Sequence, residues 1–288
     1  MEKVETITFR VLKKVYRKRD KWCRKFNFGH LLIIGGSIHY SGSPALAALA
    51  ALRAGVDLVT IIAPKRAADI IASFKPDLIA YPVECDYFTP SKIDDVLEFF
   101  HKKDALVIGG GMLRKEEVKE FITKVIEKVE IPCVIDADAI YAIAENKKCI
   151  KGKEVIITPH AYEFFILSGE RVKENLEDRI KKAKKIASEL NCTILLKGHI
   201  DVIACKERIA INETGSVYMT KGGTGDTLAG ICGAFLARGV DCFTAACAAA
   251  WLNGKAGEFA ARKYGESLLA SDLIEEIPNV LRKYLEIQ

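Results

Sequence analysis

Apolar residues along the chain fall into two recurring patterns. One is a short continuous run rich in Val, Ile and Leu, and the other is a longer segment with apolar positions three or four residues apart. The short runs are typical of buried strands, and the longer segments are typical of helices that cover a core on one side. The predicted strands occupy residues 30–34, 57–63, 78–81, 105–108, 133–135, 155–158, 193–196, 202–205 and 209–212. The predicted helices occupy residues 43–55, 65–74, 91–101, 115–128, 176–190, 226–238, 242–262 and 271–284, the first with Ser43 as its N-cap and Pro44 in its first turn.

The order of these elements predicts the fold class. Strand and helix alternate over most of the chain, which is typical of a parallel sheet covered by helices on both faces. We therefore expect an α/β protein with a central, mostly parallel sheet. No linker divides the 288 residues, so residues 1–288 are predicted to form one domain, with residues 1–28 as a basic N-terminal segment.

Glycine or polar residues follow most of the predicted strands. These strand ends are residues 35–37, 109–112, 136–138, 158–160, 197–199 and 212. Ligands of such sheets bind at the carboxyl ends of the strands, so the sequence predicts a site built from these turns. His160, which follows Thr158 and Pro159, is a candidate ligand contact and equally a candidate structural residue.

A glycine loop at residues 221–230 is the most informative stretch. Gly222, Gly223 and Gly225 precede a predicted helix, and such a loop lets backbone N–H groups and the helix dipole face an anion. Asp226 stands at this anion site. A carboxylate there either caps the helix or takes a proton from a hydroxyl that attacks a phosphate, and we prefer the second interpretation.

Composition and charge narrow the class of protein. Half of the residues are hydrophobic, the net charge is +5, and nine scattered cysteines form no C-x-x-C pair. No apolar run reaches the length of a membrane span, and the first residues lack the apolar stretch of a signal peptide, so we expect a cytoplasmic protein. The basic residues gather in the N-terminal segment, where a solvated helix face is a simpler interpretation than nucleic-acid binding, and where they would also attract a polyphosphate.

Several familiar sites are absent from the sequence. There is no G-x-G-x-x-G after the first strand, no P-loop and no G-x-S-x-G elbow. The five histidines show no spacing of the kind that binds zinc. We therefore assign no residue as a metal ligand.

Taken together, the motifs resemble a known family. The G-G-T-G-D loop is similar to the signature of the ribokinase-like superfamily. The more particular resemblance is to the NAD(P)H-hydrate dehydratases of that superfamily. It rests on Lys25 to Gly29, LLIIGGS at 31–37, the alanine-rich helix at 47–55, VIDADA at 134–139, TPH at 158–160, LKG at 196–198, NETG at 212–215 and ASDL at 270–273.

This resemblance implies an enzyme that repairs hydrated nicotinamide cofactors. Such an enzyme removes water from the S epimer of NAD(P)H hydrate and consumes a nucleotide, here ADP, with release of AMP and phosphate. Phosphorylation of the ring hydroxyl turns a poor leaving group into a good one. Asp226 would take the hydroxyl proton, N–H groups around Gly223 to Gly225 would stabilise the phosphate, and Mg²⁺ would shield the nucleotide.

The resemblance also implies the remaining contacts. The substrate residues are Ser43, Pro44, Gly111, His160 and Asp226. The nucleotide residues are Lys197, Gly198, His199, Ile200, Asp201, Asn212, Gly223, Thr224 and Gly225. Three positions depart from the family pattern: Leu113 replaces a glycine, Asn253 replaces a frequent histidine, and Asp201 replaces a threonine where an extra carboxylate would repel phosphate, so Asp201 is expected to face elsewhere.

The resemblance implies partners as well. ADP is expected as donor rather than ATP, the protein is expected to be a homo-oligomer, a tetramer, and apolar residues at 242–251 suggest an interface. An epimerase that interconverts the two hydrate epimers would be a separate protein, because about 28 residues before the matched region are too few for a domain. Two other functions remain open: a vitamin-type small-molecule kinase of the same superfamily, and a non-catalytic nucleotide-binding module, against which Asp226 argues.

Overall fold

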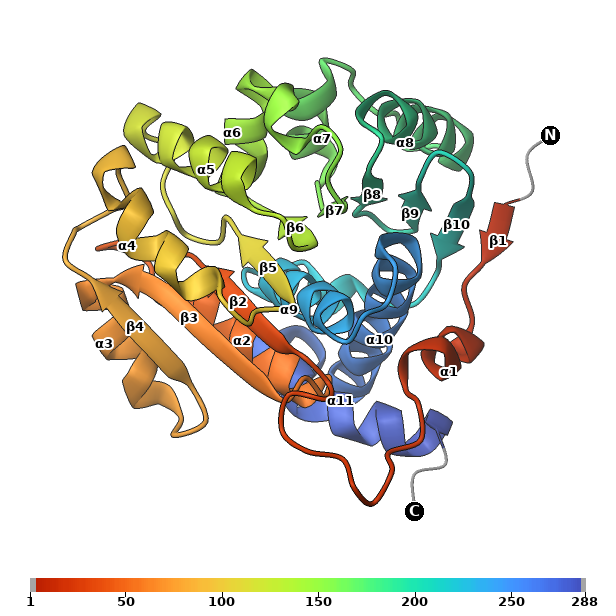
Figure 1. The fold of residues 1–288 in the computed structure, drawn as a ribbon. Coiled ribbons are helices and arrows are strands. Elements are labelled where there is room, and N and C mark those ends of the chain that lie inside the picture. The colour runs from red at the N-terminus through yellow and green to blue at the C-terminus, as the bar shows by residue number, and fades with distance from the viewer. Residues whose placement is uncertain (1–3, 286–288) are drawn as a thin grey trace.

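A single ten-stranded sheet runs through the molecule (Figure 1). The computed structural model describes residues 4–285. Across the sheet the order is β1-β10-β9-β8-β7-β6-β5-β2-β3-β4. The strand bounds are β1 Val4–Thr6, β2 His30–Ile34, β3 Leu58–Pro64, β4 Ile79–Val83, β5 Ala105–Ile108, β6 Cys133–Ile135, β7 Val155–Ile157, β8 Thr193–Leu196, β9 Asp201–Ala204 and β10 Ile209–Asn212. The α/β class and the mostly parallel sheet predicted from the sequence are confirmed.

Only β9 runs against its neighbours among the described strands. It pairs antiparallel with both β8 and β10, and every other pairing is parallel. The turns that join β8 to β9 and β9 to β10 are short, and a short turn reverses the chain, whereas a parallel pair needs a long crossover. This part of the sheet is therefore a meander attached to the parallel portion.

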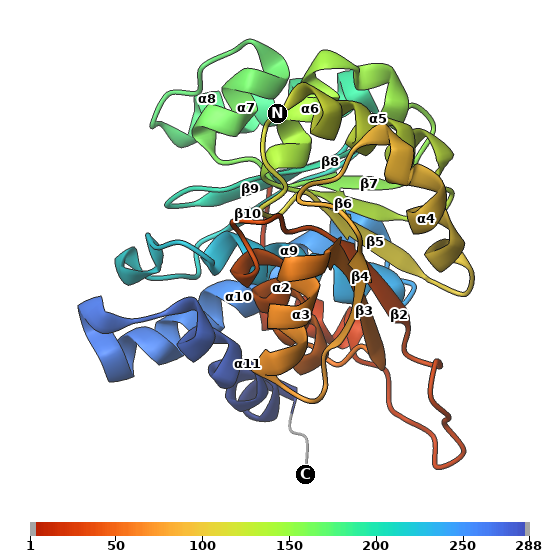
Figure 2. The same cartoon turned by 90° about the vertical axis from the view of Figure 1, so that its left-hand side faces the viewer.

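Helices cover both faces of the sheet (Figure 2). One layer contains α2 Gly42–Arg53, α3 Lys65–Phe74, α9 Thr224–Ala237, α10 Cys242–Tyr264 and α11 Ala270–Leu285, and the other contains α4 Ile93–Leu97, α5 Glu116–Lys128, α6 Asp138–Glu145, α7 Ala161–Ser168 and α8 Leu176–Leu190. Alternate strand residues belong to separate cores: Leu31 and Ile33 pack with the first layer, and Leu32 and Ile34 pack with the second. Both faces are buried, which explains the continuous apolar runs of the strands.

The strand order reverses between β2 and β5. From β2 the chain proceeds outward to β3 and β4, then returns so that β5 lies on the other side of β2, and β6 to β8 continue in that direction. The connections on the two sides of this point leave in opposite directions, which opens a crevice at the carboxyl ends of β2 and β5. The pocket described below lies there.

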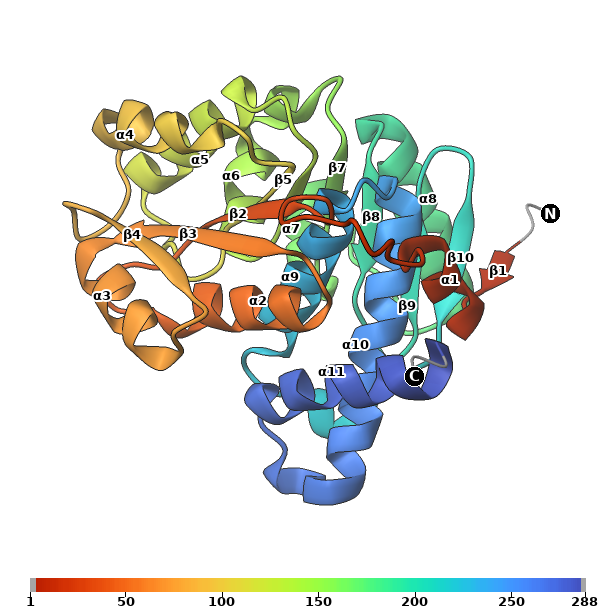
Figure 3. The same cartoon turned by 60° about the horizontal axis from the view of Figure 1, so that its bottom comes forward.

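The N-terminal segment is more structured than a solvated helix face. β1 pairs with β10 at the edge of the sheet, a 3₁₀ turn spans Phe9–Val11, and α1 spans only Leu12–Val15. Leu12 and Val15 are buried in the core, and α1 lies beside α10 (Figure 3). The segment was predicted to form a solvated helix face. Among its described residues, only 12–15 form an α-helix, and that helix also buries two side chains.

The structure differs from the sequence predictions in three further places. The helix expected at 91–101 is divided into a 3₁₀ turn at Pro90–Lys92, α4, and a second 3₁₀ turn at Glu98–Phe100. α6 and α7 were not predicted, because each is only eight residues long and follows directly after a strand-end turn. Residues 243–251 are buried inside the chain and offer no exposed apolar surface, so they do not support an interface.

Among residues 4–285, no helix combines sufficient length with sufficient hydropathy to cross a bilayer.

Candidate active site

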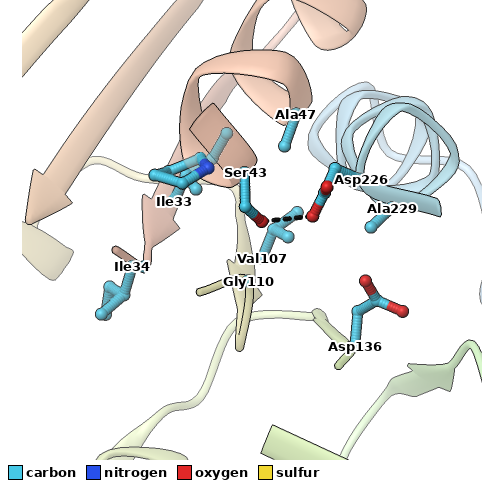
Figure 4. Close-up of a pocket in the computed structure, with 11 residues that line it drawn as sticks. Ile33, Ile34, Ser43, Ala47, Val107, Gly110, Asp136, Asp226 and Ala229 are labelled. Atoms are coloured by element: carbon cyan, nitrogen blue, oxygen red, sulfur yellow. Dashed lines mark hydrogen bonds between the residues drawn. The ribbon is translucent and has the colours of Figure 1, made fainter. Parts of the chain in front are cut away.

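A narrow pocket lies at the reversal of strand order (Figure 4). Its walls come from the carboxyl ends of β2, β5 and β6 and from the first turns of α2 and α9. Apolar side chains make up most of the lining, and Ser43, Asp136 and Asp226 are its polar side chains. The lining residues are Ile33, Ile34, Gly35, Ser43, Pro44, Ala47, Val107, Gly110, Asp136, Asp226 and Ala229.

Asp226 reaches this pocket from the first turn of α9. The helix begins at Thr224 with Gly223 as its N-cap, and Gly223 has a φ of 98°, a left-handed conformation that glycine adopts without strain. Thr227 N–H donates the first bond of the helix, to the Gly223 carbonyl at 3.0 Å. The three preceding N–H groups therefore point toward the end of the helix, as an anion site requires. Asp226 is not the cap, so the alternative role considered for it is excluded.

Ser43 holds the Asp226 carboxylate from α2. Its hydroxyl donates a hydrogen bond to Asp226 Oδ1 (Figure 4). The prediction that Ser43 caps α2 was wrong, because the helix begins one residue earlier and Ser41 is at the N-cap position without a side-chain bond. Pro44 does lie in the first turn of the helix, and it is buried at the pocket wall.

Small residues let α2, α9 and the β5 turn meet closely. A Cβ at Gly110 would overlap the Ser43 hydroxyl, and a Cβ at Gly230 would overlap the Ala47 carbonyl. Gly111 follows with a φ of 69°, and a Cβ there would lie 2.8 Å from Tyr40 Cβ. The glycines therefore serve the close approach of backbone segments around the two polar side chains.

Burial sets the charge state of Asp226. The pKa of its carboxyl is raised from 3.8 to about 6, first because burial disfavours the ionised form and then because Asp136 is negatively charged nearby. The Ser43 hydrogen bond and the Lys197 ammonium act in the opposite direction. The result is a carboxylate that ionises close to neutral pH, which suits a general base.

Lys197 occupies the centre of a second polar group. Its Nζ lies 3.2 Å from Asp136 Oδ1 and 3.7 Å from Glu163 Oε2, and Thr158 donates to the same Asp136 oxygen at 2.6 Å. Burial acts to lower the pKa of Lys197, but the two carboxylates outweigh it, so the pKa is raised and the ammonium stays charged. A Cβ at Gly225 would lie 3.5 Å from Lys197 Nζ, so the cation lies against the glycine loop.

Asp201 closes the loop that follows Lys197. Its carboxylate accepts bonds from Gly198 N–H and from the Asn212 amide, both at 3.0 Å, and burial raises its pKa. Asp201 is therefore occupied within its own loop, as expected from its unfavourable charge. His199 lies at the exposed tip of the loop with the half-buried Ile200 next to it.

His160 has a structural contact at the rim of the site. Its Nδ1 accepts the N–H groups of Tyr162 and Glu163 at 3.1 and 3.2 Å, and Glu163 bonds back to His160 N–H, which forms a capping box at the start of α7. The other ring nitrogen, Nε2, lies 3.4 Å from Glu163 Oε1, and half of the side chain is exposed.

The structure brings some of the residues expected from the sequence together and leaves others apart. Ser43, Pro44, Lys197, Gly225 and Asp226 lie around the pocket and glycine loop. Thr224 contributes its hydroxyl to the carbonyls of Met219 and Lys221, at 2.9 and 3.1 Å, so its side chain secures the loop.

Asp136 and Glu163 both contact Lys197, and the sequence analysis assigned neither a role, although Asp136 lies in one of the predicted strand-end turns. The signal for Asp136 was its position directly after a predicted strand. The signal for Glu163 was its position three residues after His160, but its contact with Lys197 follows from a helix that the sequence pattern did not reveal.

A preformed metal cage is absent from the described part of the chain. Among residues 4–285, no group of three or more His, Cys, Asp or Glu side chains is arranged to hold a metal ion. The two carboxylates nearest the glycine loop are already in contact, Asp226 with Ser43 and Asp136 with Lys197.

The fold and site first define a class. The chain has a mostly parallel sheet with a strand-order reversal and a glycine loop that opens a helix with an aspartate in its first turn. Its fold is that of an Enterococcus faecalis ribokinase-like superfamily protein, with a TM-score of 0.84 at 23% identity, covering 98% of this chain and 96% of that chain. Residues 31–279 match the family model described as NAD(P)H-hydrate dehydratase. The chain therefore belongs to the NAD(P)H-hydrate dehydratase family.

Individual relatives agree with this assignment. The chain is 40% identical over 263 residues to the bifunctional NAD(P)H-hydrate repair enzyme of Pyrobaculum aerophilum, covering 91% of this chain and 52% of the relative. It is 36% identical over 269 residues to the ADP-dependent (S)-NAD(P)H-hydrate dehydratase of Cenarchaeum symbiosum, covering 93% of each. The chain thus spans about half the length of the bifunctional relatives that it matches.

A solved structure extends the similarity to three dimensions. The ADP/ATP-dependent NAD(P)H-hydrate dehydratase from Bacillus subtilis, co-crystallised with ATP and Mg²⁺, superposes with a TM-score of 0.86 at 29% identity, covering 98% of this chain and 99% of that chain.

Proposed function

We propose that this chain catalyses the nucleotide-dependent dehydration of (S)-NAD(P)H hydrate to NAD(P)H, with ADP as phosphoryl donor and AMP and phosphate as products. The observation that carries the proposal is the position of Asp226, whose carboxylate lies in an apolar pocket at the first turn of α9, beside the glycine loop. Family membership supports the reaction, and the name of the Cenarchaeum relative supports ADP.

Asp226 acts as the general base of the phosphoryl transfer. It takes the proton of the ring hydroxyl while the hydroxyl oxygen attacks the terminal phosphorus of the nucleotide. Its raised pKa keeps it basic enough for this step, and Ser43 fixes its orientation.

The glycine loop and Lys197 receive the nucleotide phosphates. The free N–H groups of Thr224 and Gly225 open α9, the Lys197 ammonium lies against Gly225, and together they would stabilise negative charge as it moves to the leaving group. The adenosine part would follow the 198–201 loop, with Gly198, His199 and Ile200 as contacts. Asp201 and Asn212 would hold that loop in shape, since they bond to each other and to its first residue.

The hydrated nicotinamide ring would enter between α2 and the β5 turn. Ser43 and Pro44 line this side of the pocket, and Gly111 lies next to it, where the absence of a side chain lets the β5 turn approach Tyr40 closely. His160 at the rim would contact the substrate with the exposed side of its ring.

Magnesium would enter together with the nucleotide. The ion usually keeps several waters and is held by substrate phosphates with one or two carboxylates, so a site without a dedicated cage is compatible with it. When bound, it supplies positive charge that shields the phosphates. We assign no side chain of the described residues as its ligand.

The remaining partner and domain predictions are proposals of the same kind. We propose that residues 1–288 act as one dehydratase domain, that a separate epimerase supplies the S epimer, and that the protein forms a homo-oligomer. The cytoplasmic location expected from the sequence also stays a prediction.

The direct test follows the absorbance of the reduced nicotinamide ring. Purified protein is mixed with NADH hydrate and Mg²⁺, with ADP or ATP in parallel samples, and Asp226→Asn is measured alongside. We expect a nucleotide-dependent rise in absorbance, faster with ADP, that the variant reduces by about 10²–10⁴-fold. If folded protein binds ADP but produces no NADH with either nucleotide, the proposal is wrong, and phosphorylation of small hydroxylated substrates becomes the next assay.

A further inference from the structure

Dehydration requires two proton transfers, and the general base described above accounts for only one. After phosphoryl transfer, the hydroxyl-bearing ring carbon carries a phosphate ester. Formation of the double bond then needs loss of a proton from the neighbouring ring carbon. Because Asp226 already holds the hydroxyl proton at that moment, either Asp226 must release it first or another base must be present.

Asp136 meets the requirements for a second base. It follows β6, 4% of its surface is exposed, and it lines the same pocket as Asp226. Figure 4 shows both side chains extending into this pocket, one from the β6 turn and the other from α9. A ring bound between them would present its two adjacent carbons to two carboxylates.

The contacts of Asp136 leave one oxygen available. Thr158 and Lys197 both bond to Oδ1, at 2.6 and 3.2 Å. Among the described residues, none donates a hydrogen bond to Oδ2. Asp136 lines the pocket and has one carboxylate oxygen without a hydrogen bond, so it offers a proton acceptor to a ring bound there.

Asp136 and Asp226 have different polar partners, which suits them to different steps of the reaction. Lys197 pairs directly with Asp136 and not with Asp226, whereas Asp226 bonds to the neutral Ser43. Two carboxylates in unequal environments are a common arrangement for separate acid and base roles.

We propose that Asp136 is the base of the elimination step, an inference that rests on the proposed dehydratase function. The bond between the neighbouring ring carbon and hydrogen breaks, and its electron pair forms the carbon–carbon double bond. The carbon–oxygen bond to the phosphate breaks, and its electron pair leaves with the phosphate. The proton goes to Asp136 Oδ2, and the products are the reduced nicotinamide and inorganic phosphate.

The test separates the two steps by their products. AMP reports phosphoryl transfer, and reduced nicotinamide reports elimination, so both are measured in a rapid-quench experiment with NADH hydrate, ADP and Mg²⁺. In Asp136→Asn, we expect AMP to form in the first turnover within about tenfold of the native rate, whereas nicotinamide formation falls by about 10²–10⁴-fold and phosphorylated hydrate accumulates. Deuterium at the neighbouring ring carbon should slow nicotinamide formation in this variant and leave AMP formation unchanged.

Glu163→Gln is the matched control. Glu163 is the other carboxylate beside Lys197, and it does not line the pocket. If Asp136 only positioned Lys197, both variants would slow AMP and nicotinamide formation by the same factor, and that result would overturn the proposal. If Asp136 is the base, only substitution of Asp136 should slow nicotinamide formation much more than AMP formation.

A second variant covers the case in which Asp136→Asn does not fold. Asp136→Glu keeps the charge opposite Lys197 and displaces the carboxylate by one methylene, so nicotinamide formation should lag behind AMP formation. Equal loss of both products in this variant also contradicts the proposal. Failure of the dehydratase function itself has a different signature, because the native protein would then form no nicotinamide at all.

Discussion

At the scale of single residues, the pKa of Asp226 is set by burial, which raises it, and by polar contacts, which lower it. Burial and the nearby Asp136 raise its pKa to about 6, while Ser43 and Lys197 limit the rise. The carboxylate is therefore ionised over most of the physiological pH range and still binds a proton more strongly than an exposed aspartate does.

This balance predicts how activity depends on pH. A base must be ionised to accept a proton, so kcat/KM for nicotinamide formation should rise with pH through about 6 and then level off. Ser43→Ala removes a hydrogen bond that favours the ionised form, so its inflection should lie at higher pH. Activity that is constant from about one unit below to one unit above that pKa would contradict the assignment.

The same raised pKa predicts that Asp226 reduces stability. Below the ordinary pKa of 3.8, both the folded and the unfolded chain are protonated at this position, so no penalty exists. As pH rises, the unfolded chain ionises first, and the penalty is complete above about 6. Asp226→Asn should therefore raise the free energy of unfolding by up to about 3 kcal/mol at neutral pH.

Urea denaturation at several pH values measures this effect. The gain in the free energy of unfolding should decrease as pH falls below about 6 and be nearly absent below about pH 3, where Asp226 is neutral in both the folded and the unfolded chain. A gain that is the same at acidic and neutral pH would show that charge is not its cause.

At the scale of elements, the contact between α2 and α9 sets the geometry of the pocket. Ser43 and Asp226 lie in the first turns of these two helices, and the helices approach where Gly230 faces the Ala47 carbonyl. The distance between the helices therefore controls the hydrogen bond between the two polar residues.

Gly230→Ala tests this control. The new Cβ would overlap the backbone of α2, so the helices must separate, and we expect a loss of about 1–3 kcal/mol in the free energy of unfolding. Activity should fall as well, because Ser43 moves away from Asp226. Gly42→Ala is the control, since nothing lies within 4 Å of its Cβ position, and both stability and activity should be nearly native there. Native activity in Gly230→Ala would show that the site tolerates a wider helix spacing.

At the scale of the whole molecule, the N-terminal segment connects distant parts of the fold. β1 extends the sheet at β10, Leu12 enters the core beside α10, and the Tyr16 hydroxyl donates to the Ala54 carbonyl at 2.8 Å, just beyond the end of α2. The segment therefore contributes to the core despite its many exposed basic residues.

Leu12→Ala should consequently destabilise the protein by about 2–5 kcal/mol, because a fully buried leucine is replaced by a cavity. Lys13→Ala changes the exposed neighbour on the same short helix and should alter stability by less than about 0.5 kcal/mol. Thermal or urea unfolding compares the two variants. If both variants lower the free energy of unfolding by the same small amount, the N-terminal segment does not contribute to the core.

Much of the architecture was predictable because it depends on local patterns. Continuous apolar runs located nearly all the strands, and a glycine at the end of a helix or a strand marked its boundary. The rule that ligands bind at the carboxyl ends of parallel strands then identified the turns around Asp226, Lys197 and His160 as candidates. The sequence by itself thus determined the fold class, the family resemblance and the general location of the site.

The tertiary structure decided which of these turns meet and in what relation. Ser43 and Asp226 are 183 residues apart and Lys197 and Asp136 are 61 apart, so no local pattern connects them. The same limit explains why the pairing of β1 and the burial of residues 243–251 were not predicted. Hydrophobic periodicity reports which side of an element is buried, whereas the choice of partner follows from packing of the whole chain, and that packing placed two carboxylates with unequal partners in one pocket.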